Sequence, residues 1–227
     1  MKVVVFDLDD TLYEELTFVR SGFKSVARLL NEHFQVNAQE AFKIMCDVLE
    51  KEGRGQVFNR VLSYYGLETR RNVMRCLSEY RLHQPLIELS SDADLVLSRL
   101  KELGYPVYIV TDGNKNVQYN KIKALGLEDR VEKCYITYRY GHHRSKPSPY
   151  CFELIAKREK VRFDEIVYVG DNPNKDFVGI KPLGFRTIRI RKGHFKNVMK
   201  SVEYNAEAEI ETLHELLRVL VKWKTQT

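Results

Sequence analysis

Cysteine is scarce in this sequence, and its few positions lie far apart. Four cysteines occur among 227 residues and none of them forms a C-x-x-C pair. Zinc sites and disulfide frameworks usually show close or regular cysteine spacing, so neither is expected. Scattered, reduced thiols are typical of a cytoplasmic protein. The cysteines are Cys46, Cys76, Cys134 and Cys151.

Long apolar runs are absent as well. No stretch of the sequence approaches the roughly 20 residues that a membrane-spanning helix requires. The first residues lack the longer apolar region and the small-residue cleavage site of a signal peptide. Hydrophobic residues make up 44% and charged residues 30% of the chain, a balance typical of folded globular proteins. We therefore expect a cytoplasmic protein that has no membrane partner.

Positive charge is in excess, but it is not gathered in one basic region. The formal net charge is +6, and the basic residues are dispersed apart from one concentration over residues 186–196. Dispersed charge usually marks a solvated surface, so nucleic acid is not an expected partner. A mild positive field favours encounter with small anionic substrates.

Strand-like and helix-like segments alternate over most of the chain. Short β-branched or aromatic runs predict buried strands at residues 3–6, 107–110, 134–137, 166–169 and 187–190. Apolar residues at helical spacing predict helices at residues 92–103, 116–125, 149–157 and 213–221. This alternation predicts an α/β fold, a Rossmann-like doubly wound parallel sheet with crossover helices.

Residues 13–88 break the alternation. This stretch contains helical periodicities and no convincing strand. We interpret it as an α-helical bundle inserted after the first strand. The predicted domain organisation is a core formed by residues 1–12 and 89–227, with the helical bundle at 13–88.

The segment D-L-D-D-T-L directly follows the first predicted strand. Alternate residues of an extended chain point the same way, so Asp7 and Asp9 can face one point in space. Two converging carboxylates repel each other unless a cation lies between them. Oxygen-rich acidic sites suit Mg²⁺, although this pattern alone also fits a helix-capping turn.

Three further polar clusters lie at later strand ends or just beyond one. T-D-G at residues 111–113 offers a hydroxyl and backbone N–H groups to phosphate oxygens. Lys146, in a K-P pair, can neutralise charge on a nucleophile and on a phosphoryl group. In G-D-N-P-N-K-D at residues 170–176, Asp171 can complete a Mg²⁺ site and Asp176 can orient Lys146 or a metal-bound water. Each cluster alone also fits an ordinary turn or a solvated loop.

The order and approximate spacing of the four clusters resemble the motifs of the haloacid dehalogenase-like hydrolases. The matching segments are D-L-D-D-T-L, T-D-G, K-P and G-D-N-P-N-K-D, and Lys146 precedes Asp171 by 25 residues. The resemblance covers most of residues 1–190. The helical insertion resembles the type 1 cap of that family.

The resemblance implies a role for each matched residue. Asp7 would be the nucleophile, and Asp9 would be the general acid for the leaving group and then the base for water. Thr111 and the backbone near Asp112 would bind phosphate, and Lys146 would stabilise charge. The ligands of Mg²⁺ would be Asp7, the backbone carbonyl of Asp9, and Asp171. Asp112 departs from the Asn that often follows this Thr or Ser in the family, which affects only the contacts of that side chain.

The sequence thus predicts a magnesium-dependent phosphatase, a monomer or homodimer, that forms a phosphoryl-aspartate with a small phosphorylated metabolite. The substrate classes considered are sugar phosphates, nucleotides and flavin nucleotides. A sugar-phosphate mutase, other activities of the family and a non-catalytic phosphate-binding protein stay as alternatives. Neither dehalogenation nor mere binding requires the acid Asp9. Arg54, in a flexible loop at residues 52–56, is a candidate to bind a second anionic group, and an ordinary surface arginine is the competing interpretation.

Overall fold

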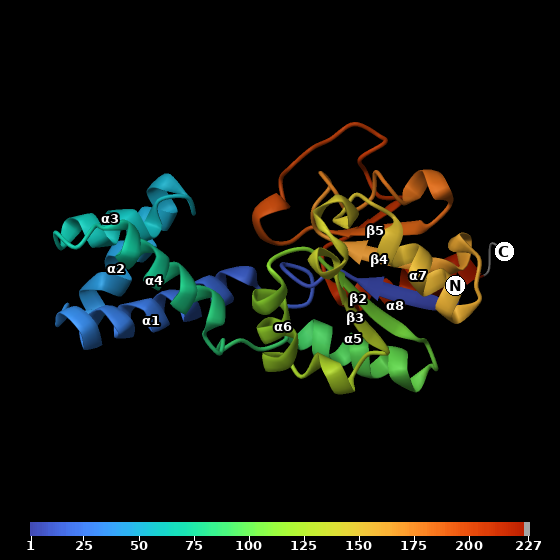
Figure 1. Cartoon of the computed structure of the whole chain (residues 1–227). Coiled ribbons are helices and arrows are strands. Elements are labelled where there is room, and N and C mark those ends of the chain that lie inside the picture. The colour runs from blue at the N-terminus through green and yellow to red at the C-terminus, as the bar shows by residue number, and fades with distance from the viewer. Residues whose placement is uncertain (225–227) are drawn as a thin grey trace. The chain divides into compact units, whose positions relative to one another are not determined.

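The computed structural model describes residues 1–224 of the chain, which divides into two compact units (Figure 1). The core unit comprises Met1–Glu15 and Glu88–Thr227, and the helical unit comprises Leu16–Ile87. Each unit has its own cluster of buried apolar side chains. The insertion expected at residues 13–88 therefore differs from the helical unit by three residues at its start and one at its end.

A six-stranded parallel sheet forms the centre of the core unit. Its strand order is β3-β2-β1-β4-β5-β6, the order of a doubly wound Rossmann-like sheet, and the predicted fold class is confirmed. The strands are β1 (Val3–Phe6), β2 (Val107–Thr111), β3 (Lys133–Ile136), β4 (Ile166–Gly170), β5 (Arg186–Ile190) and β6 (Ala208–Ile210).

Strand β6 is missing from the sequence prediction, which gave five strands where the sheet has six. Its three residues, A-E-I, pair with β5 alone at the edge of the sheet. A run this short gives no measurable periodicity, so only its pairing identifies it as a strand. The other five strands begin and end within one residue of the predicted bounds.

The register of the sheet gathers its carboxyl ends at one edge. Phe6 of β1 is aligned with Ile109 of β2 and with Val169 of β4. All residues of these three strands are buried, because apolar side chains cover both faces of parallel strands. The polar residues that follow each strand are therefore brought to the same edge.

Helices complete the core unit. The α-helices are α5 (Ser91–Glu102), α6 (Lys115–Ala124), α7 (Tyr150–Glu159) and α8 (Leu216–Lys224). The short 3₁₀ helices are η1 (Leu127–Asp129), η2 (Thr137–Tyr140), η3 (His142–Arg144), η4 (Phe163–Glu165), η5 (Lys181–Leu183), η6 (Gly193–Phe195) and η7 (Leu213–Glu215). The first three predicted helices are confirmed within two residues at each end. The predicted C-terminal helix is divided between η7 and α8.

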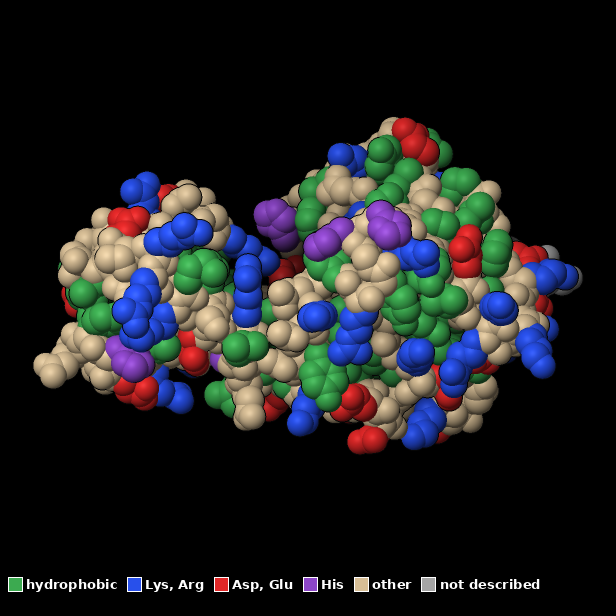
Figure 2. Space-filling view, in the orientation of Figure 1, with side chains coloured by type: hydrophobic (Ala, Val, Ile, Leu, Met, Phe, Trp, Pro, Cys, Tyr) green, Lys and Arg blue, Asp and Glu red, His purple; other side chains and the backbone are tan. Residues whose placement is uncertain are grey.

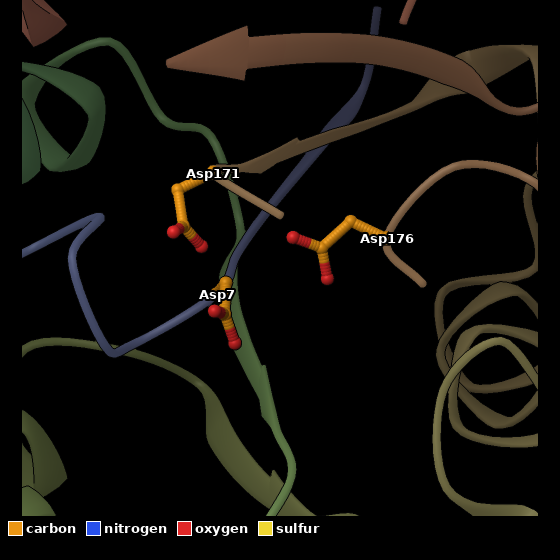
Figure 3. A group of neighbouring side chains, drawn as sticks. All are labelled: Asp7, Asp171 and Asp176. Atoms are coloured by element: carbon orange, nitrogen blue, oxygen red, sulfur yellow. The ribbon is translucent and has the colours of Figure 1, made fainter. Parts of the chain in front are cut away.

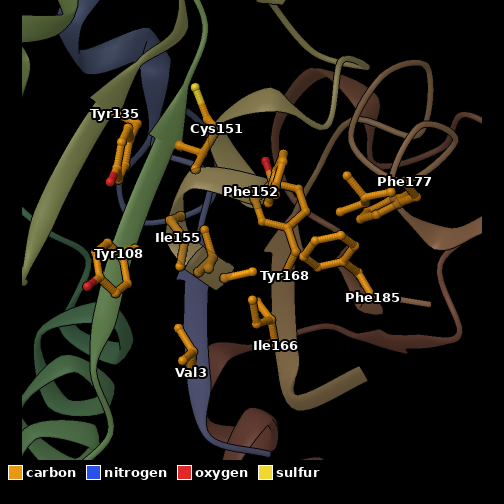
Figure 4. Packing of buried hydrophobic residues seen from close by; sticks show 14 residues of the cluster. Val3, Tyr108, Tyr135, Cys151, Phe152, Ile155, Ile166, Tyr168, Phe177 and Phe185 are labelled. Atoms are coloured by element: carbon orange, nitrogen blue, oxygen red, sulfur yellow. The ribbon is translucent and has the colours of Figure 1, made fainter. Parts of the chain in front are cut away.

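Helix α7 packs on the sheet through aromatic side chains (Figure 4). Phe152 meets Tyr168 of β4 edge to face, with ring centroids 4.8 Å apart, and meets Phe185 at 5.9 Å. Phe177, in the loop after β4, lies 6.3 Å from the Tyr168 ring. Such pairs contribute about 0.5–1.5 kcal/mol each beyond the burial of their area. This packing fixes β4 and the loop that follows it, both of which carry polar residues of interest.

Four helices build the helical unit: α1 (Glu15–Phe34), α2 (Ala38–Glu52), α3 (Val57–Tyr64) and α4 (Arg70–Leu82). The first residue of α1, Glu15, is the last residue of the first segment of the core unit. Asn37 caps α2 by accepting hydrogen bonds from the backbone of Gln39 and Glu40. Gly22 of α1 allows close approach of α4, because a Cβ at that position would lie 2.4 Å from the Tyr80 ring. Residues 16–87 contain no strand, as the sequence predicts.

Charged side chains are spread over the face of the molecule that Figure 2 shows. On the face shown in Figure 2, Lys and Arg side chains are interspersed with acidic and apolar ones. None of the helices described is both long and apolar enough to cross a membrane.

Asp92 joins the start of α5 to the C-terminal part of the core unit. Its Oδ2 accepts hydrogen bonds from the Lys192 ammonium at 2.8 Å and from the Leu213 backbone at 3.0 Å. Burial alone would raise the pKa of Asp92, but the hydrogen bonds from Lys192, Ser90 and Leu213 lower it from 3.8 to about 2. The stabilisation by the ionised carboxylate is therefore complete above pH 3.8 and is lost as the pH falls from 3.8 to about 2.

Asp92→Asn is expected to destabilise the protein by about 1.5–3 kcal/mol at pH 7, the usual loss for hydrogen bonds to a charged group. The difference from wild type should shrink as the pH falls below 4, which urea unfolding across this range measures. Asp94→Asn makes the same charge change on the same helix, at a side chain that is 61% exposed, and should cost much less. A deficit of Asp92→Asn that does not vary with pH would contradict the assignment.

Candidate functional site

A group of buried carboxylates lies at the carboxyl edge of the sheet. Asp7 directly follows β1 and Asp171 directly follows β4, its neighbour in the sheet. The chain order of the strands reverses between these two strands, which is where ligands bind in open α/β sheets. Asp7, Asp171 and Asp176 each offer a carboxylate oxygen, and these oxygens lie within 4.8 Å of one another (Figure 3). The sequence prediction grouped Asp7, Asp9 and Asp171 as metal ligands and gave Asp176 a supporting role. The structure places Asp176 in the group with Asp7 and Asp171, and the Asp9 carboxylate is not part of it.

Lys146 neutralises part of this acidic group. Its ammonium is 2.7 Å from Asp7 Oδ1, 2.8 Å from Asp176 Oδ1 and 2.9 Å from the Tyr168 hydroxyl. Burial would lower the pKa of Lys146, but Asp176 and Asp7 outweigh it and hold the pKa well above its usual value. The predicted pairing of Asp176 with Lys146 is therefore present. Asp176 Oδ2 also accepts a hydrogen bond from the Asn172 backbone at 2.8 Å, which fixes the carboxylate.

The acidic group carries more negative charge than Lys146 balances. Burial raises the pKa of Asp7 to about 6, although Lys146 opposes the shift. Burial, followed by the charges of Asp176 and Asp7, raises the pKa of Asp171 to about 9. An added cation between these side chains would remove the repulsion. Hard carboxylate oxygens are the ligands that Mg²⁺ prefers, so the donor set fits this ion.

Asp9 is directed to a different set of partners. Its Oδ1 accepts hydrogen bonds from the Tyr13 hydroxyl at 2.5 Å and from Lys121 at 2.6 Å. Its Oδ2 accepts one from the Gln118 side-chain amide at 2.8 Å. Burial would raise the pKa of Asp9, but the charge of Lys121 and these hydrogen bonds lower it. The carboxylate of Asp9 is thus engaged by α6, while its backbone carbonyl is the atom predicted to bind the metal.

The predicted phosphate-binding residues are Thr111, the last residue of β2, and Asp112, which directly follows it; β2 lies on the other side of β1 from β4. Thr111 is fully buried, and its hydroxyl accepts a hydrogen bond from Gln118 at 2.6 Å. Asp112 Oδ1 accepts hydrogen bonds from the Thr137 hydroxyl at 2.6 Å and from the Lys146 backbone at 3.1 Å. The Asp112 carboxylate therefore holds the loop that carries Lys146, a contact that the sequence did not indicate.

Arg54 belongs to the helical unit. It lines a cavity of about 260 Å³ whose walls are formed within that unit. The other lining residues are mainly apolar: Val19, Phe23, Gly55, Val57, Phe58, Asn59, Val73, Leu77, Tyr80 and Arg81. The contribution of Arg54 to substrate binding stays a prediction.

Sequence reasoning missed three residues of the site: Tyr168, Gln118 and Lys121. Tyr168 reads as one more apolar residue of a buried strand, and only its hydroxyl contact with Lys146 reveals a polar role. Gln118 and Lys121 lie three residues apart on α6, a spacing that places both on one helix face. Both residues are only 2% exposed. A lysine is rarely buried without a partner, so a prediction of which α6 residues are buried would have marked Lys121 as a residue of interest.

The fold and the site together define a class of protein. A doubly wound α/β core carries a buried carboxylate group and a lysine at the strand-order reversal, which is the place where ligands bind in open α/β sheets. The model of the haloacid dehalogenase-like hydrolases matches residues 1–184. The chain belongs to this family and is a hydrolase, as the sequence motifs predict.

Two relatives and one solved structure illustrate the similarity. The chain is 28% identical over 231 residues to a glyceraldehyde 3-phosphate phosphatase of Methanocaldococcus jannaschii, which covers 99% of both chains. It is 26% identical to a ribulose-1,5-bisphosphate 5-phosphatase of Halopiger xanaduensis, over 94% of this chain and 96% of the relative. A crystal structure of a 2-haloacid dehalogenase from Pseudomonas syringae superposes with a TM-score of 0.67 at 22% identity, over 98% of this chain and 99% of the other. This last likeness shows the fold alone.

Proposed function

We propose that this protein is a magnesium-dependent phosphomonoesterase that forms a phosphoryl-aspartate on Asp7. The observation that carries the proposal is the buried Asp7 carboxylate at the end of β1, paired with the Lys146 ammonium at 2.7 Å and surrounded by Asp171 and Asp176. A carboxylate nucleophile and a phosphate dianion repel each other. The site therefore needs positive charge beside the nucleophile, and Lys146 supplies part of it.

The proposed reaction has two displacements. An oxygen of Asp7 attacks phosphorus, the bond between phosphorus and the ester oxygen breaks, and Asp9, which must be in its protonated form for this step, gives its proton to the leaving oxygen. Water then attacks the phosphoryl-aspartate, Asp9 takes the proton of the water, and inorganic phosphate leaves with Asp7 restored. Splitting one difficult displacement into two lowers the barrier, and a well-placed acid contributes typically ~10²–10⁴-fold.

Asp7, Asp171 and the backbone carbonyl of Asp9 are the proposed ligands of Mg²⁺. When bound, this ion would shield the phosphate charge from Asp7 and so reduce the repulsion. Asp176 holds Lys146 through a contact of 2.8 Å between Oδ1 and Nζ. Thr111 and the backbone that follows it would bind the phosphate oxygens. The geometry of Asp112 favours a supporting role for its side chain, because its oxygens are used by Thr137, Lys146 and Lys175.

Removal of divalent metal should abolish hydrolysis, and Mg²⁺ should restore it. Ca²⁺ should restore little, because its larger and looser coordination shell displaces the nucleophile. Mg²⁺ at about 100 times its Kd should also stabilise the folded protein by about 2.7 kcal/mol, visible as a rise in Tm. Asp171→Asn should lose this rise, whereas Asp129→Asn, an exposed change in the same unit, should keep it. Full activity of metal-free protein would refute the dependence.

Sugar phosphates are the substrate class that we favour. Relatives that span almost the whole chain carry the names glyceraldehyde 3-phosphate phosphatase and ribulose-1,5-bisphosphate 5-phosphatase. A panel of phosphorylated metabolites, assayed by phosphate release with p-nitrophenyl phosphate as the generic reference, tests this choice. A nucleotide or flavin nucleotide as the best substrate would overturn it. Arg54 is proposed to contact a second anionic group, and the cytoplasmic location and the monomeric or dimeric state stay predictions.

The same panel, extended with a 2-haloacid, separates the alternatives. A mutase would convert one sugar phosphate into its isomer with little release of phosphate. A dehalogenase would release halide from a 2-haloacid, but the presence of Asp9 argues against it, because that reaction needs no acid there. A non-catalytic phosphate-binding protein would do neither.

A further inference from the structure

Helix α6 presents two buried polar side chains to Asp9. Lys121 Nζ lies 2.6 Å from Asp9 Oδ1, and Gln118 Nε2 lies 2.8 Å from Asp9 Oδ2. Neither residue belongs to the four motifs that place Asp7, Asp9, Thr111, Lys146 and Asp171 in the site. The proposed acid–base residue, Asp9, therefore has two partners that the four motifs do not include.

The Gln118 amide joins two parts of the site. Its nitrogen donates one hydrogen bond to Asp9 Oδ2 and another to the Thr111 hydroxyl at 2.6 Å. A side-chain amide nitrogen has two hydrogens, so both of its donors are used. The contact with the Asp9 carboxylate identifies this end of the amide as nitrogen, because an ionised carboxylate only accepts hydrogen bonds. Gln118 thus sets the Asp9 carboxylate relative to Thr111, the residue proposed to bind the phosphate.

Lys121 is a costly residue to bury. Its side chain is only 3% exposed, and its ammonium lies between Asp9, at 2.6 Å, and Glu15 Oε1, at 3.9 Å. Removing an ammonium from water costs several kcal/mol, which close carboxylates can offset. Together with the Tyr13 hydroxyl at 2.5 Å, Lys121 occupies Oδ1 of Asp9. Among the described residues Oδ2 accepts only the Gln118 hydrogen bond, so this oxygen retains capacity for a further partner.

We propose that Gln118 and Lys121 are positioning residues that fix the Asp9 carboxylate with Oδ2 available for proton exchange with the leaving group and the attacking water. This inference rests on the proposed function. It assigns the pair Q-x-x-K of α6 a part in the reaction, although neither side chain is proposed to touch the substrate. Displacement of a reacting group by about 1 Å can cost on the order of 10²-fold in rate.

Lys121→Met tests the proposal, with an alkyl phosphate and p-nitrophenyl phosphate as substrates. We expect kcat for the alkyl ester to fall by about tenfold to a hundredfold, with KM changed by less than about threefold, because the substrate contacts stay in place. The first release of p-nitrophenol from the aryl ester should slow less, because this leaving group needs less protonation. Gln118→Met should act in the same direction, and Lys121→Arg should recover part of the loss. Lys123→Met, an exposed change on the same helix, is the matched control and should behave as wild type.

The decisive readout is the same substitution in an Asp9→Asn background. If Lys121 acts through Asp9, Lys121→Met should lower the residual rate by no more than about twofold there, because the group that it positions is gone. An equal loss in both backgrounds would show a general structural role and overturn the proposal. So would a slowing of the first release of p-nitrophenol equal to the loss in alkyl-ester turnover, or wild-type kcat in Lys121→Met and Gln118→Met. If instead the wild type hydrolyses neither ester, the proposed function itself has failed.

A folding defect in one variant does not block the test. Melting temperatures identify any variant that is unfolded at the assay temperature, and Gln118→Met changes no charge. The double variant Asp9→Asn/Lys121→Met also removes both members of the ion pair, so it leaves no buried charge without its partner.

Discussion

Asp7→Asn is expected to lower the hydrolysis of every phosphate ester by roughly 10⁴-fold or more, because it removes the nucleophile itself. An amide oxygen is a far weaker nucleophile than a carboxylate, whatever the leaving group. Alkyl and aryl esters should therefore be affected alike, in contrast to the changes at Asp9. The measurement is phosphate release from both kinds of ester with saturating Mg²⁺.

The fold should tolerate this change. The pKa of Asp7 is raised to about 6 by burial, so the folded protein disfavours its ionised form, and a neutral amide removes one of several crowded charges. Lys146 keeps Asp176 as a partner at 2.8 Å. The Tm of metal-free Asp7→Asn should thus equal or exceed that of wild type. Asp129→Asn, exposed in the same unit, controls for the charge change, and activity of Asp7→Asn within tenfold of wild type would exclude Asp7 as the nucleophile.

Asp9→Asn is expected to lower kcat for alkyl phosphates by ~10²–10⁴-fold, the usual contribution of a general acid. The asparagine keeps the size of the side chain and leaves the backbone carbonyl at residue 9 in place. It cannot give a proton to the leaving alkoxide or take one from water. Steady-state kinetics on an alkyl ester and on p-nitrophenyl phosphate measure the effect.

The contrast between the two esters identifies the step. A p-nitrophenolate leaves without help from an acid, so formation of the phosphoryl-aspartate from the aryl ester should be nearly unaffected. A rapid release of p-nitrophenol followed by slow turnover should then appear, because the later attack by water still lacks its base. Equal losses for both esters, with no such burst, would count against Asp9 as the proton donor.

The strands of the core and the residues that follow them could be predicted because their signals are local. Val3 to Phe6 are a continuous apolar run of β-branched and aromatic residues, which is typical of a strand buried on both faces, and Asp7 comes directly after it. The carboxyl ends of parallel strands share one edge, so Thr111 and Asp171 could be placed near Asp7 without a structure. The edge strand β6 could not be predicted in this way, because three residues are too few to show a hydrophobic periodicity.

The pairings within the site were decided by the tertiary structure. Lys146 is 139 residues from Asp7, and Lys121 is 112 residues from Asp9, so no local pattern links either pair. The sequence also left open whether Asp176 would meet Lys146 or a metal-bound water, and packing of the loop after β4 against Tyr168 brings it to Lys146. By itself the sequence determined which side chains stand at the carboxyl ends of the strands. Their partners depend on distances across the sheet and to α6, because hydrogen bonds and ion pairs act over only a few ångströms that the folded chain alone defines.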